Sequence, residues 1–558
     1  MTVEPIRSTL ATVSTDDTSL VLPSDKMQRT GQQRVLEQVK SIKRNKSKMV
    51  KKDSIPSPTS PASMTEYSEP KFQFSPTNMN GTLFKSSGSS MTASHKRMVK
   101  SHTLSLFMCR LLVSSTLFSA SSAEGSLPNI TLQEAVEFLS NSDISYQLCG
   151  ASFIQHQTFT EESSKQEVWR LGGIPALIQL LKSDNSLLHQ TAAAALRNLA
   201  FKDHSNKLEV DHCEGIEAIL TLLRNSNDTE THKQLTGLLW NLSSADKLKP
   251  ELIRNALPLL TETIVVPYSV WTDSNTNKLI DPEVFYNTTG CVRNLSCASE
   301  DERITMRSCP QLIDSLVTYI QTQMDRGEPD DKQSVENCVC ILHNLSYQLE
   351  TEAPEQFKQI SVLDTRPKEN NNKSLFSPKS SKTQKVRTDF KFPAMEREKP
   401  EGVNWLYNQK TLQLYRSLLG SSQKEATLEA CCGALQNLTA SKSSLSTLMS
   451  QSFIEKLNGL PVISPLLISG NSSLQKTAMS LVGNMSRVSS LRGAMAKDVF
   501  PMVSSVLSNV TSNMIKSDST IATACRVMQT LMLAEPETSK KMISPKLVES
   551  LTALSSNM

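Results

Sequence analysis

The residues best suited to chemistry in this 558-residue chain are asparagines that recur within a fixed phrase. Each follows a run of small apolar residues, precedes Leu or Met, and often stands beside a cation. An amide is both a donor and an acceptor, so a row of them can bind the backbone of a partner peptide. Neighbouring cations would attract acidic segments. The candidate groove residues are Arg197, Asn198, Trp240, Asn241, Arg293, Asn294, His343, Asn344, Asn437 and Asn484.

The same asparagines have an equally strong structural interpretation. Each amide can bond a turn of the neighbouring helix and so hold successive units in register. The adjacent cations can likewise be solvated. The sequence favours neither alternative over the other.

Catalytic chemistry has no candidate residues in the chain. We find no phosphate-binding loop, no Gly-x-Ser-x-Gly elbow and no His-Glu-x-x-His, and the eight histidines are scattered singly. Cys338 and Cys340 have the spacing of a metal pair, but no second pair lies nearby, so buried small residues are the favoured interpretation. We therefore expect no enzyme activity, no catalytic residues, no metal and no cofactor.

The spacing of the asparagine phrase predicts the fold. Two weaker copies extend the series, with His156 before it and Thr530 after it. With these copies included, the recurring position, here called the Asn slot, is spaced by 42, 43, 53, 50, 93, 47 and 46 residues along the chain. A period in the forties within helical sequence is typical of armadillo or HEAT solenoids, whose units bury their apolar faces only by stacking. We predict an all-α right-handed superhelix of about eight to nine armadillo repeats.

Composition divides the chain into four parts. Residues 1–124 form a basic, largely disordered head, and residues 125–353 form repeats one to five. Residues 354–402 are polar, basic and not periodic, which indicates a disordered insert and accounts for the long step of 93. Residues 403–558 form repeats six to nine, the last of them incomplete.

The head carries 17 basic and 9 acidic residues, whereas the whole chain has a net charge of only +4. Its cations gather where three apolar residues share one helical face. Such a segment can fold on a partner, lie on an acidic membrane surface, act as a nuclear address, or remain a solvated basic run. The candidate head residues are Arg34, Val35, Val39, Ile42, Lys43 and Arg44.

Four serines that precede proline are candidate phosphorylation sites, and each phosphate would subtract nearly two charges from a basic segment. They are Ser57, Ser60, Ser75 and Ser377. An apolar run from Leu104 to Phe118 is too short to cross a membrane, and Arg110 interrupts it. The chain is therefore not expected to be transmembrane.

Three long stretches resemble the armadillo repeats of the plakophilins and their catenin relatives: 234–244 (QLTGLLWNLSS), 281–296 (DPEVFYNTTGCVRNLS) and 427–441 (TLEACCGALQNLTAS). Residues 22–48 are similar to the amino-terminal homology segment of plakophilins. The resemblance covers roughly 125–558 together with that short head segment.

This resemblance implies a scaffold of the desmosomal plaque in cell–cell adhesion. Family members tie desmoplakin, and through it keratin intermediate filaments, to the tails of desmogleins and desmocollins. They reach the cytoplasmic face of the plasma membrane through partners, and also occur in the cytoplasm and nucleus, with links to RNA-associated complexes. The resemblance thus implies those partners and locations for this chain.

The alternative function is a nuclear adaptor or RNA-associated regulator that uses the basic head and the armadillo groove. Import receptors of this fold carry Trp four residues before the groove Asn. In this chain Trp240 directly precedes Asn241, and no Trp stands four residues before any other repeat Asn. The alternative is therefore ranked second.

Overall fold

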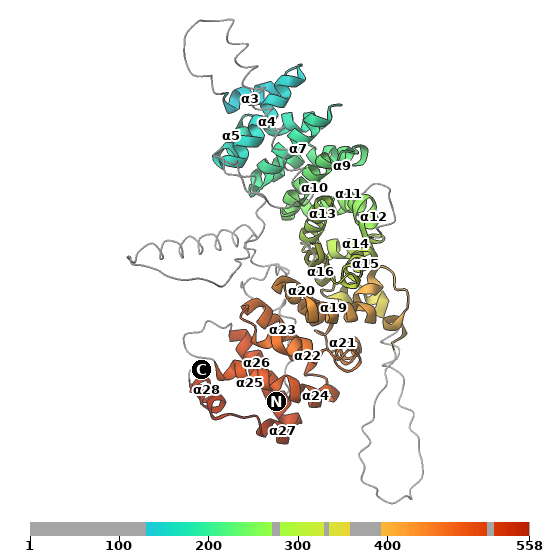
Figure 1. Ribbon diagram of the computed structural model, residues 1–558, viewed down its shortest axis with the longest axis vertical. Helices are drawn as coiled ribbons and strands as arrows, with labels where there is room; N and C mark the ends of the chain where they lie inside the picture. Colours follow the sequence, from blue (N-terminus) through green and yellow to red (C-terminus); the bar gives the residue numbers. More distant parts are fainter. Residues whose placement is uncertain (1–129, 270–279, 329–333, 358–391, 510–517, 557–558) are drawn as a thin grey trace, which may run out of the picture. The chain divides into compact units, whose positions relative to one another are not determined.

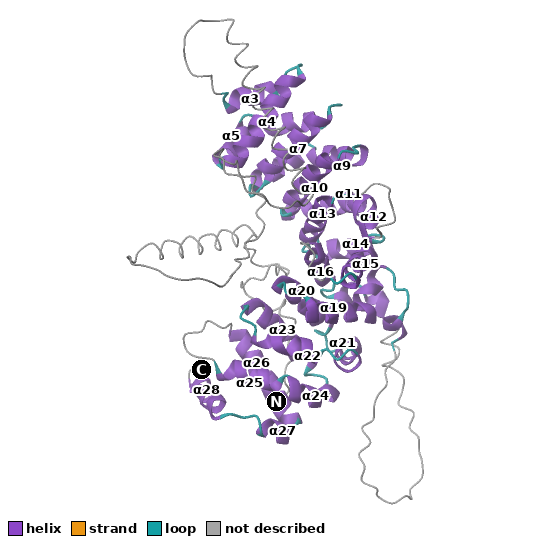
Figure 2. Ribbon diagram, viewed as in Figure 1, coloured by secondary structure: helices purple, strands orange, loops and turns teal. Residues whose placement is uncertain are grey.

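The computed structural model describes residues 130–269, 280–328, 334–357, 392–509 and 518–556. All of the regular structure in these residues is helical (Figure 2). The chain divides into two compact units, described over 130–248 and 249–556. Each unit is a stack of helices that follow one another in sequence order (Figure 1).

The unit that spans 130–248 contains two complete three-helix repeats preceded by a helix pair. Its elements are α3 (Leu132–Phe138), α4 (Ile144–Thr160), α5 (Ser163–Arg170), α6 (Gly173–Leu180), α7 (Ser186–Ala200), α8 (His204–His212), α9 (Gly215–Asn225), α10 (Thr229–Ser243) and η2 (Asp246–Leu248).

The unit that spans 249–556 contains the remaining repeats. Its first elements are α11 (Lys249–Leu260), η3 (Thr261–Val265), α12 (Val266–Ser269), α13 (Pro282–Leu295), α14 (Glu300–Ser308), α15 (Leu312–Asp325), α16 (Ser334–Leu345) and α17 (Leu349–Glu352). Then come η4 (Pro393–Glu396), η5 (Gly402–Tyr407), α19 (Gln409–Ser421), α20 (Glu425–Leu438), α21 (Ser444–Gln451), η6 (Ser452–Lys456), α22 (Leu460–Ile463), η7 (Ser464–Ile468) and α23 (Ser472–Met485). The last are η8 (Ser489–Leu491), α24 (Arg492–Asp498), α25 (Phe500–Ser508), α26 (Asp518–Ala534), α27 (Pro536–Lys540) and α28 (Pro545–Ser556).

Local sequence explains where the helices begin. At the start of α3, Thr131 and Glu134 form a capping box, in which the Glu134 carboxylate accepts from the Thr131 N–H at 2.7 Å. At the start of α7, Asn185 accepts from the N–H groups of Leu187 and Leu188. These caps satisfy backbone donors that a helix start leaves unpaired.

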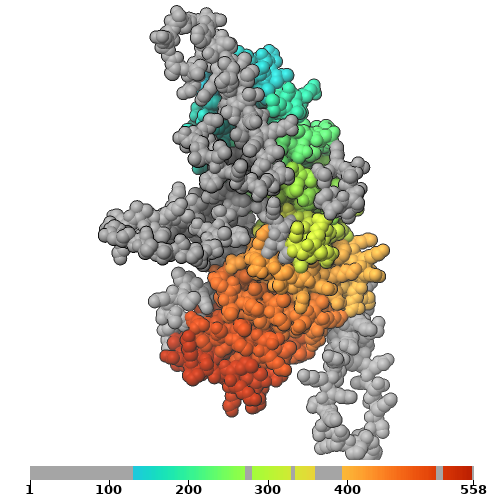
Figure 3. All heavy atoms as spheres, viewed as in Figure 1, coloured from blue at the N-terminus to red at the C-terminus, as the bar shows by residue number. Residues whose placement is uncertain are grey.

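The last helix of each repeat forms the core of its stack. In α7, residues 191–196 are buried, and Ala192, Ala193 and Ala195 are fully enclosed. Such small side chains let α4 and α10 both pack closely against α7. In the second unit, α16 packs against α20, α20 against α23, and α23 against α26. Figure 3 shows α19 to α28 as one continuous mass of atoms.

The long step of 93 residues is resolved by direct packing of α16 against α20. Among the described residues, no further closing helix stands between them in the sequence, which favours a long junction over a repeat that lacks the Asn phrase. Chain that the structure describes resumes at residue 392, before the expected boundary at 403. Phe392 and Met395 are buried there, because their apolar side chains pack into the stack next to Tyr407.

One second helix of a repeat is less regular than its counterparts. Residues 460–468 form one turn of α22 followed by the 3-10 segment η7, whereas α6, α9 and α15 are each a single continuous helix. Pro465 lacks an N–H and cannot make the hydrogen bond that would continue α22.

Candidate functional site

The recurring asparagines form a ladder of hydrogen bonds between closing helices. In the first unit, Asn241 Nδ2 donates to the carbonyl of Arg197 at 2.9 Å, and Asn198 Nδ2 donates to the carbonyl of Gln155 at 3.0 Å. Each acceptor immediately precedes the recurring position of the previous repeat: Arg197 precedes Asn198, and Gln155 precedes His156. The weak copy at His156 is therefore a true member of the series.

The second unit repeats this geometry. Asn437 Nδ2 donates to the carbonyl of His343 at 3.1 Å, and Asn484 Nδ2 to that of Gln436 at 3.2 Å. Asn344 instead donates to Ser296 Oγ at 2.8 Å. Asn294 lies half-buried in α13.

The amide nitrogens of five slots thus serve the stacking of repeats. For these donors, the geometry supports hydrogen bonding between neighbouring repeats and not the binding of a partner peptide. The amide oxygens of Asn344 and Asn484 differ, because they are buried and have no hydrogen-bond partner. An acceptor in that state favours any ligand that brings an N–H group to it.

The residues next to the ladder do not share one environment. Arg197 is half-buried, and its Nη1 lies 3.3 Å from Gln234 Oε1. A Cβ added at Gly237 would come within 2.6 Å of the Arg197 guanidinium, so the glycine leaves room for this side chain. Arg293 pairs with Glu336 at 3.0 Å and thereby joins α13 to α16. Trp240 is half-buried in α10.

His343 departs from the expectation that it is a cation lining the groove. The side chain is only 6% exposed, and burial followed by the charge of Arg293 lowers its pKa to about 4. Its ring packs where a Cβ on Gly433 would lie, 2.5 Å from Cε1. His343 is therefore a neutral core residue at neutral pH.

A second row of cations holds the ends of the closing helices, and sequence reasoning missed it. Lys165 Nζ donates to the carbonyl of Phe201 at 2.7 Å, just past the end of α7. Lys207 Nζ donates to Ser244 Oγ at 2.7 Å, at the end of α10, and burial lowers its pKa to about 8. Cations are favourable at this end of a helix dipole. The 42-residue spacing of the two lysines was the available signal.

The same role falls to arginine in the second unit. Arg307 Nε donates to the carbonyl of Leu345 at 2.8 Å, beyond which α16 ends. Arg307 and Arg303 also pair with Glu352, whose side chain is fully buried. This cluster fixes α17 against α14, immediately before the insert.

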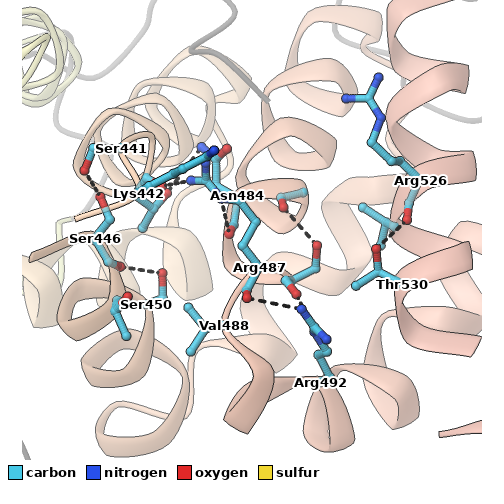
Figure 4. Close-up of a pocket in the computed structure, with 15 residues that line it drawn as sticks. Ser441, Lys442, Ser446, Ser450, Asn484, Arg487, Val488, Arg492, Arg526 and Thr530 are labelled. Carbon is cyan, nitrogen blue, oxygen red and sulfur yellow. Dashed lines mark hydrogen bonds between the residues drawn. The ribbon is translucent and has the colours of Figure 1, made fainter. Parts of the chain in front are cut away.

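At the far end of the second unit, a hollow of about 420 Å³ lies between α20, α21, α23, α24 and α26 (Figure 4). Lys442, Arg487, Arg492 and Arg526 line it, together with Asn484 of the ladder. No acidic side chain lines the hollow. The hollow is therefore a basic concave surface next to a ladder asparagine.

Several predicted sites lie outside the described residues. They are Arg34, Val35, Val39, Ile42, Lys43 and Arg44 of the head, the serines Ser57, Ser60, Ser75 and Ser377, and the run 104–118. Among the residues that are described, no helix is long and apolar enough to cross a membrane. Within the same residues, no cluster of three side chains suits a metal ion. Cys338 and Cys340 are fully buried and form no disulfide.

Comparison with known proteins agrees with this architecture. The family profile described as "Armadillo/beta-catenin-like repeat" matches residues 162–201 and 203–244. Plakophilin-2 of Mus musculus is 44% identical over 411 residues, which cover 72% of this chain and 51% of the relative. Plakophilin-2 of Homo sapiens is 35% identical over 497 residues, which cover 80% of this chain and 56% of the relative.

A more distant relative and one solved structure extend the comparison. Catenin delta-2 of Homo sapiens is 33% identical over 445 residues, which cover 76% of this chain and 36% of the relative. A crystal structure of an engineered protein has a TM-score of 0.52 at 16% identity, over 75% of this chain and 81% of that one, and supports the fold alone. The chain spans about half the length of the plakophilin-2 relatives that it matches.

Proposed function

The chain belongs to the plakophilin family of armadillo-repeat proteins, and from this premise we propose that it is a non-enzymatic scaffold of the desmosomal plaque. In this proposal it links desmoplakin and intermediate filaments to the tails of desmogleins and desmocollins at the cytoplasmic face of the plasma membrane. The observation that carries the proposal is the similarity to plakophilin-2, which covers 72% of the chain. The armadillo repeats of residues 125–353 and 403–558 are together called the rod below.

The proposal assigns separate tasks to the head and the rod. The basic segment 22–48 recruits acidic partners, because its cations surround one apolar helical face. The rod presents Trp240 and the cations beside the ladder to a cadherin tail. The stacked repeats support this division because solenoids expose extended binding surfaces.

The head is tested in epithelial cells that lack their own plakophilins. We expect Arg34→Glu, Lys43→Glu and Arg44→Glu together to reduce desmoplakin fluorescence at cell borders severalfold. The matched control reverses three other head charges, at Lys71, Lys85 and Lys96. Equal recruitment by both triple variants and the unaltered chain would remove the proposed role of the segment.

The rod is tested by binding of the purified chain to cadherin tail peptides. We expect Trp240→Ala to weaken the binding of desmoglein and desmocollin tails about tenfold, the loss typical of an aromatic anchor. Trp169→Ala is the control, because Trp169 is 40% exposed on α5 and lies away from the ladder sequence. Equal affinities for the two variants would contradict a groove contact at Trp240.

A second candidate function is that of a nuclear adaptor or an RNA-associated regulatory protein. The observation that favours it is the excess of basic over acidic residues in the head. Binding through phosphates would weaken steeply with salt, with a slope near −0.7 per contact on single strands. A salt titration with single-stranded RNA measures this slope, and a flat titration would exclude the candidate.

A further inference from the structure

The basic hollow at the end of the second unit has a built interior. Four cations surround it, from the loop after α20, from both sides of the α23–α24 junction, and from α26 (Figure 4). Seven hydroxyl side chains complete its polar wall. They are Thr439, Ser441, Ser446, Thr447, Ser450, Ser486 and Thr530.

Two of the arginines are fixed in place by carbonyl groups alone. Arg487 donates to the carbonyls of Asn484 at 3.0 Å and Ala440 at 2.9 Å, and also to the carbonyl of Thr439. Arg492 donates to the carbonyls of Ser486 at 2.8 Å and Arg487 at 3.2 Å. Both guanidiniums keep N–H groups unused, because each has five.

Neither guanidinium has an acidic partner among the described residues. Burial lowers the pKa of Arg487, with no carboxylate raising it in compensation. Two positive charges without a carboxylate partner thus line the same hollow, which is an arrangement that a bound anion would stabilise. Their orientation is set before any ligand arrives, so little ordering remains to be done on binding.

The other two cations are free to close on a ligand. Lys442 and Arg526 are exposed, and neither charged side-chain end forms a hydrogen bond or ion pair with the described part of the chain. Figure 4 shows Arg526 on the helix α26, across the hollow from Lys442.

A ladder asparagine supplies an independent observation in the same hollow. Asn484 lines it, is only 3% exposed, and has a buried Oδ1 without a partner, while its Nδ2 is used by the ladder. An anion alone cannot satisfy that oxygen. A peptide backbone N–H next to an acidic side chain is the kind of donor that this oxygen lacks.

We propose that this hollow binds a phosphorylated serine or threonine side chain carried by an extended peptide. A phosphate monoester brings up to two charges and three acceptor oxygens to the guanidinium forks, whereas a single carboxylate would leave most of the cations unbalanced. Only two apolar residues, Val488 and Val527, line the hollow, so a membrane surface fits it less well. This site would be separate from the contacts in the proposed desmosomal function and does not depend on them.

The proposal is tested with the full chain and three degenerate peptide libraries. Their central residue is phosphoserine, serine or glutamate, and fluorescence anisotropy at about 0.15 M salt measures binding. We expect the phosphoserine library to bind at least tenfold more tightly than the other two. We also expect the double variant Lys442→Gln with Arg526→Gln to lose at least tenfold of that affinity.

The control variant is Lys497→Gln with Lys541→Gln, which removes the same charge from exposed lysines outside the hollow. It should change affinity less than twofold, and both variants should unfold at the temperature of the unaltered chain. Equal losses in the two variants would show unspecific charge attraction and overturn the site.

Three other outcomes would also overturn the proposal. Equal binding of the glutamate library would indicate a general acidic groove. Competition by inorganic phosphate at the concentration of the peptide would indicate a small-anion site. Binding to phosphoinositide vesicles that falls in the hollow variant, without any preference for phosphopeptide, would indicate a membrane contact.

Discussion

The hydrogen bonds of Asn437 give the most specific prediction, because they join α20 to α16 on the other side of the insert. Its Nδ2 donates to the carbonyl of His343 and to Ser346 Oγ, both at 3.1 Å. Two such bonds contribute about 0.5–1.5 kcal/mol each, so Asn437→Ala should lower the free energy of unfolding by roughly 1–3 kcal/mol. In a unit of this size each kcal/mol lowers the melting temperature by about 2–4 °C.

Two further variants determine whether the donor itself is responsible. Asn437→Asp should cost more than Asn437→Ala, because a carboxylate would face the His343 carbonyl with no proton to share. Asn255→Ala is the control, since Asn255 is exposed on α11 and has no hydrogen bond to a described side chain. Alanine there should be neutral or slightly stabilising, because it favours helix.

Thermal denaturation gives the size of the effect, and hydrogen exchange gives its location. Amides of α16 and α20 should exchange faster in Asn437→Ala, while those of α7 should not change. Suppose that Asn437→Ala and Asn255→Ala have the same melting temperature and that hydrogen exchange in α20 is unaltered. The hydrogen bonds of Asn437 then contribute nothing to stacking. The recurring asparagines would then need another explanation, such as contact with a partner.

Three more expectations concern the second unit. The pKa of His343 is about 4 when folded and about 6.5 when unfolded, so the unfolded state binds more protons between these values and stability should fall by about 3 kcal/mol as the pH drops from 6.5 to 4. His343→Gln should lessen this loss in urea titrations, and parallel pH profiles would contradict it. Gly433→Ala should lower the free energy of unfolding by about 1–3 kcal/mol, because the added Cβ would lie 2.5 Å from the enclosed His343 ring. Gly420→Ala is the control and should cost nothing, because its Cβ would lie 3.4 Å from Val462. Similar melting temperatures for the two variants would refute the clash. Glu352→Gln should lower the free energy of unfolding by about 3–5 kcal/mol, because it leaves two buried arginines without their carboxylate. Glu396→Gln removes the carboxylate of a half-exposed pair and should cost at most about 1 kcal/mol in the same denaturation assay. Equal losses would contradict the role of burial.

The sequence predicted the repeats well because each closing helix carries its own signal. Small residues, a recurring Asn and an interval mostly of 42 to 53 residues together identify α7, α10, α13, α16, α20 and α23. These features are local, since a helix of that composition must bury its small face against a neighbour. Even the weak slot at His156 fitted, because the acceptor of Asn198 is a carbonyl, which every residue possesses.

The site was less predictable, because its features arise from contacts across repeats. His343 looked like a groove cation, yet Gly433, ninety residues away in sequence, makes space that encloses its ring. The basic hollow joins Lys442, Arg487 and Arg526 from three different repeats, and no spacing rule relates them. The irregular α22–η7 segment follows from one proline whose effect depends on its exact place in the turn.

Direct docking of α16 on α20 has a consequence for how the molecule tolerates change. The two helices are held by their own contact and not by the polypeptide that connects them. In general, each doubling of the length of a flexible connection costs only about 0.6 kcal/mol of closure entropy. Splice variation, tags or new regulatory motifs can therefore accumulate between residues 358 and 391 at small thermodynamic expense, while the spacing of the repeats on both sides is preserved.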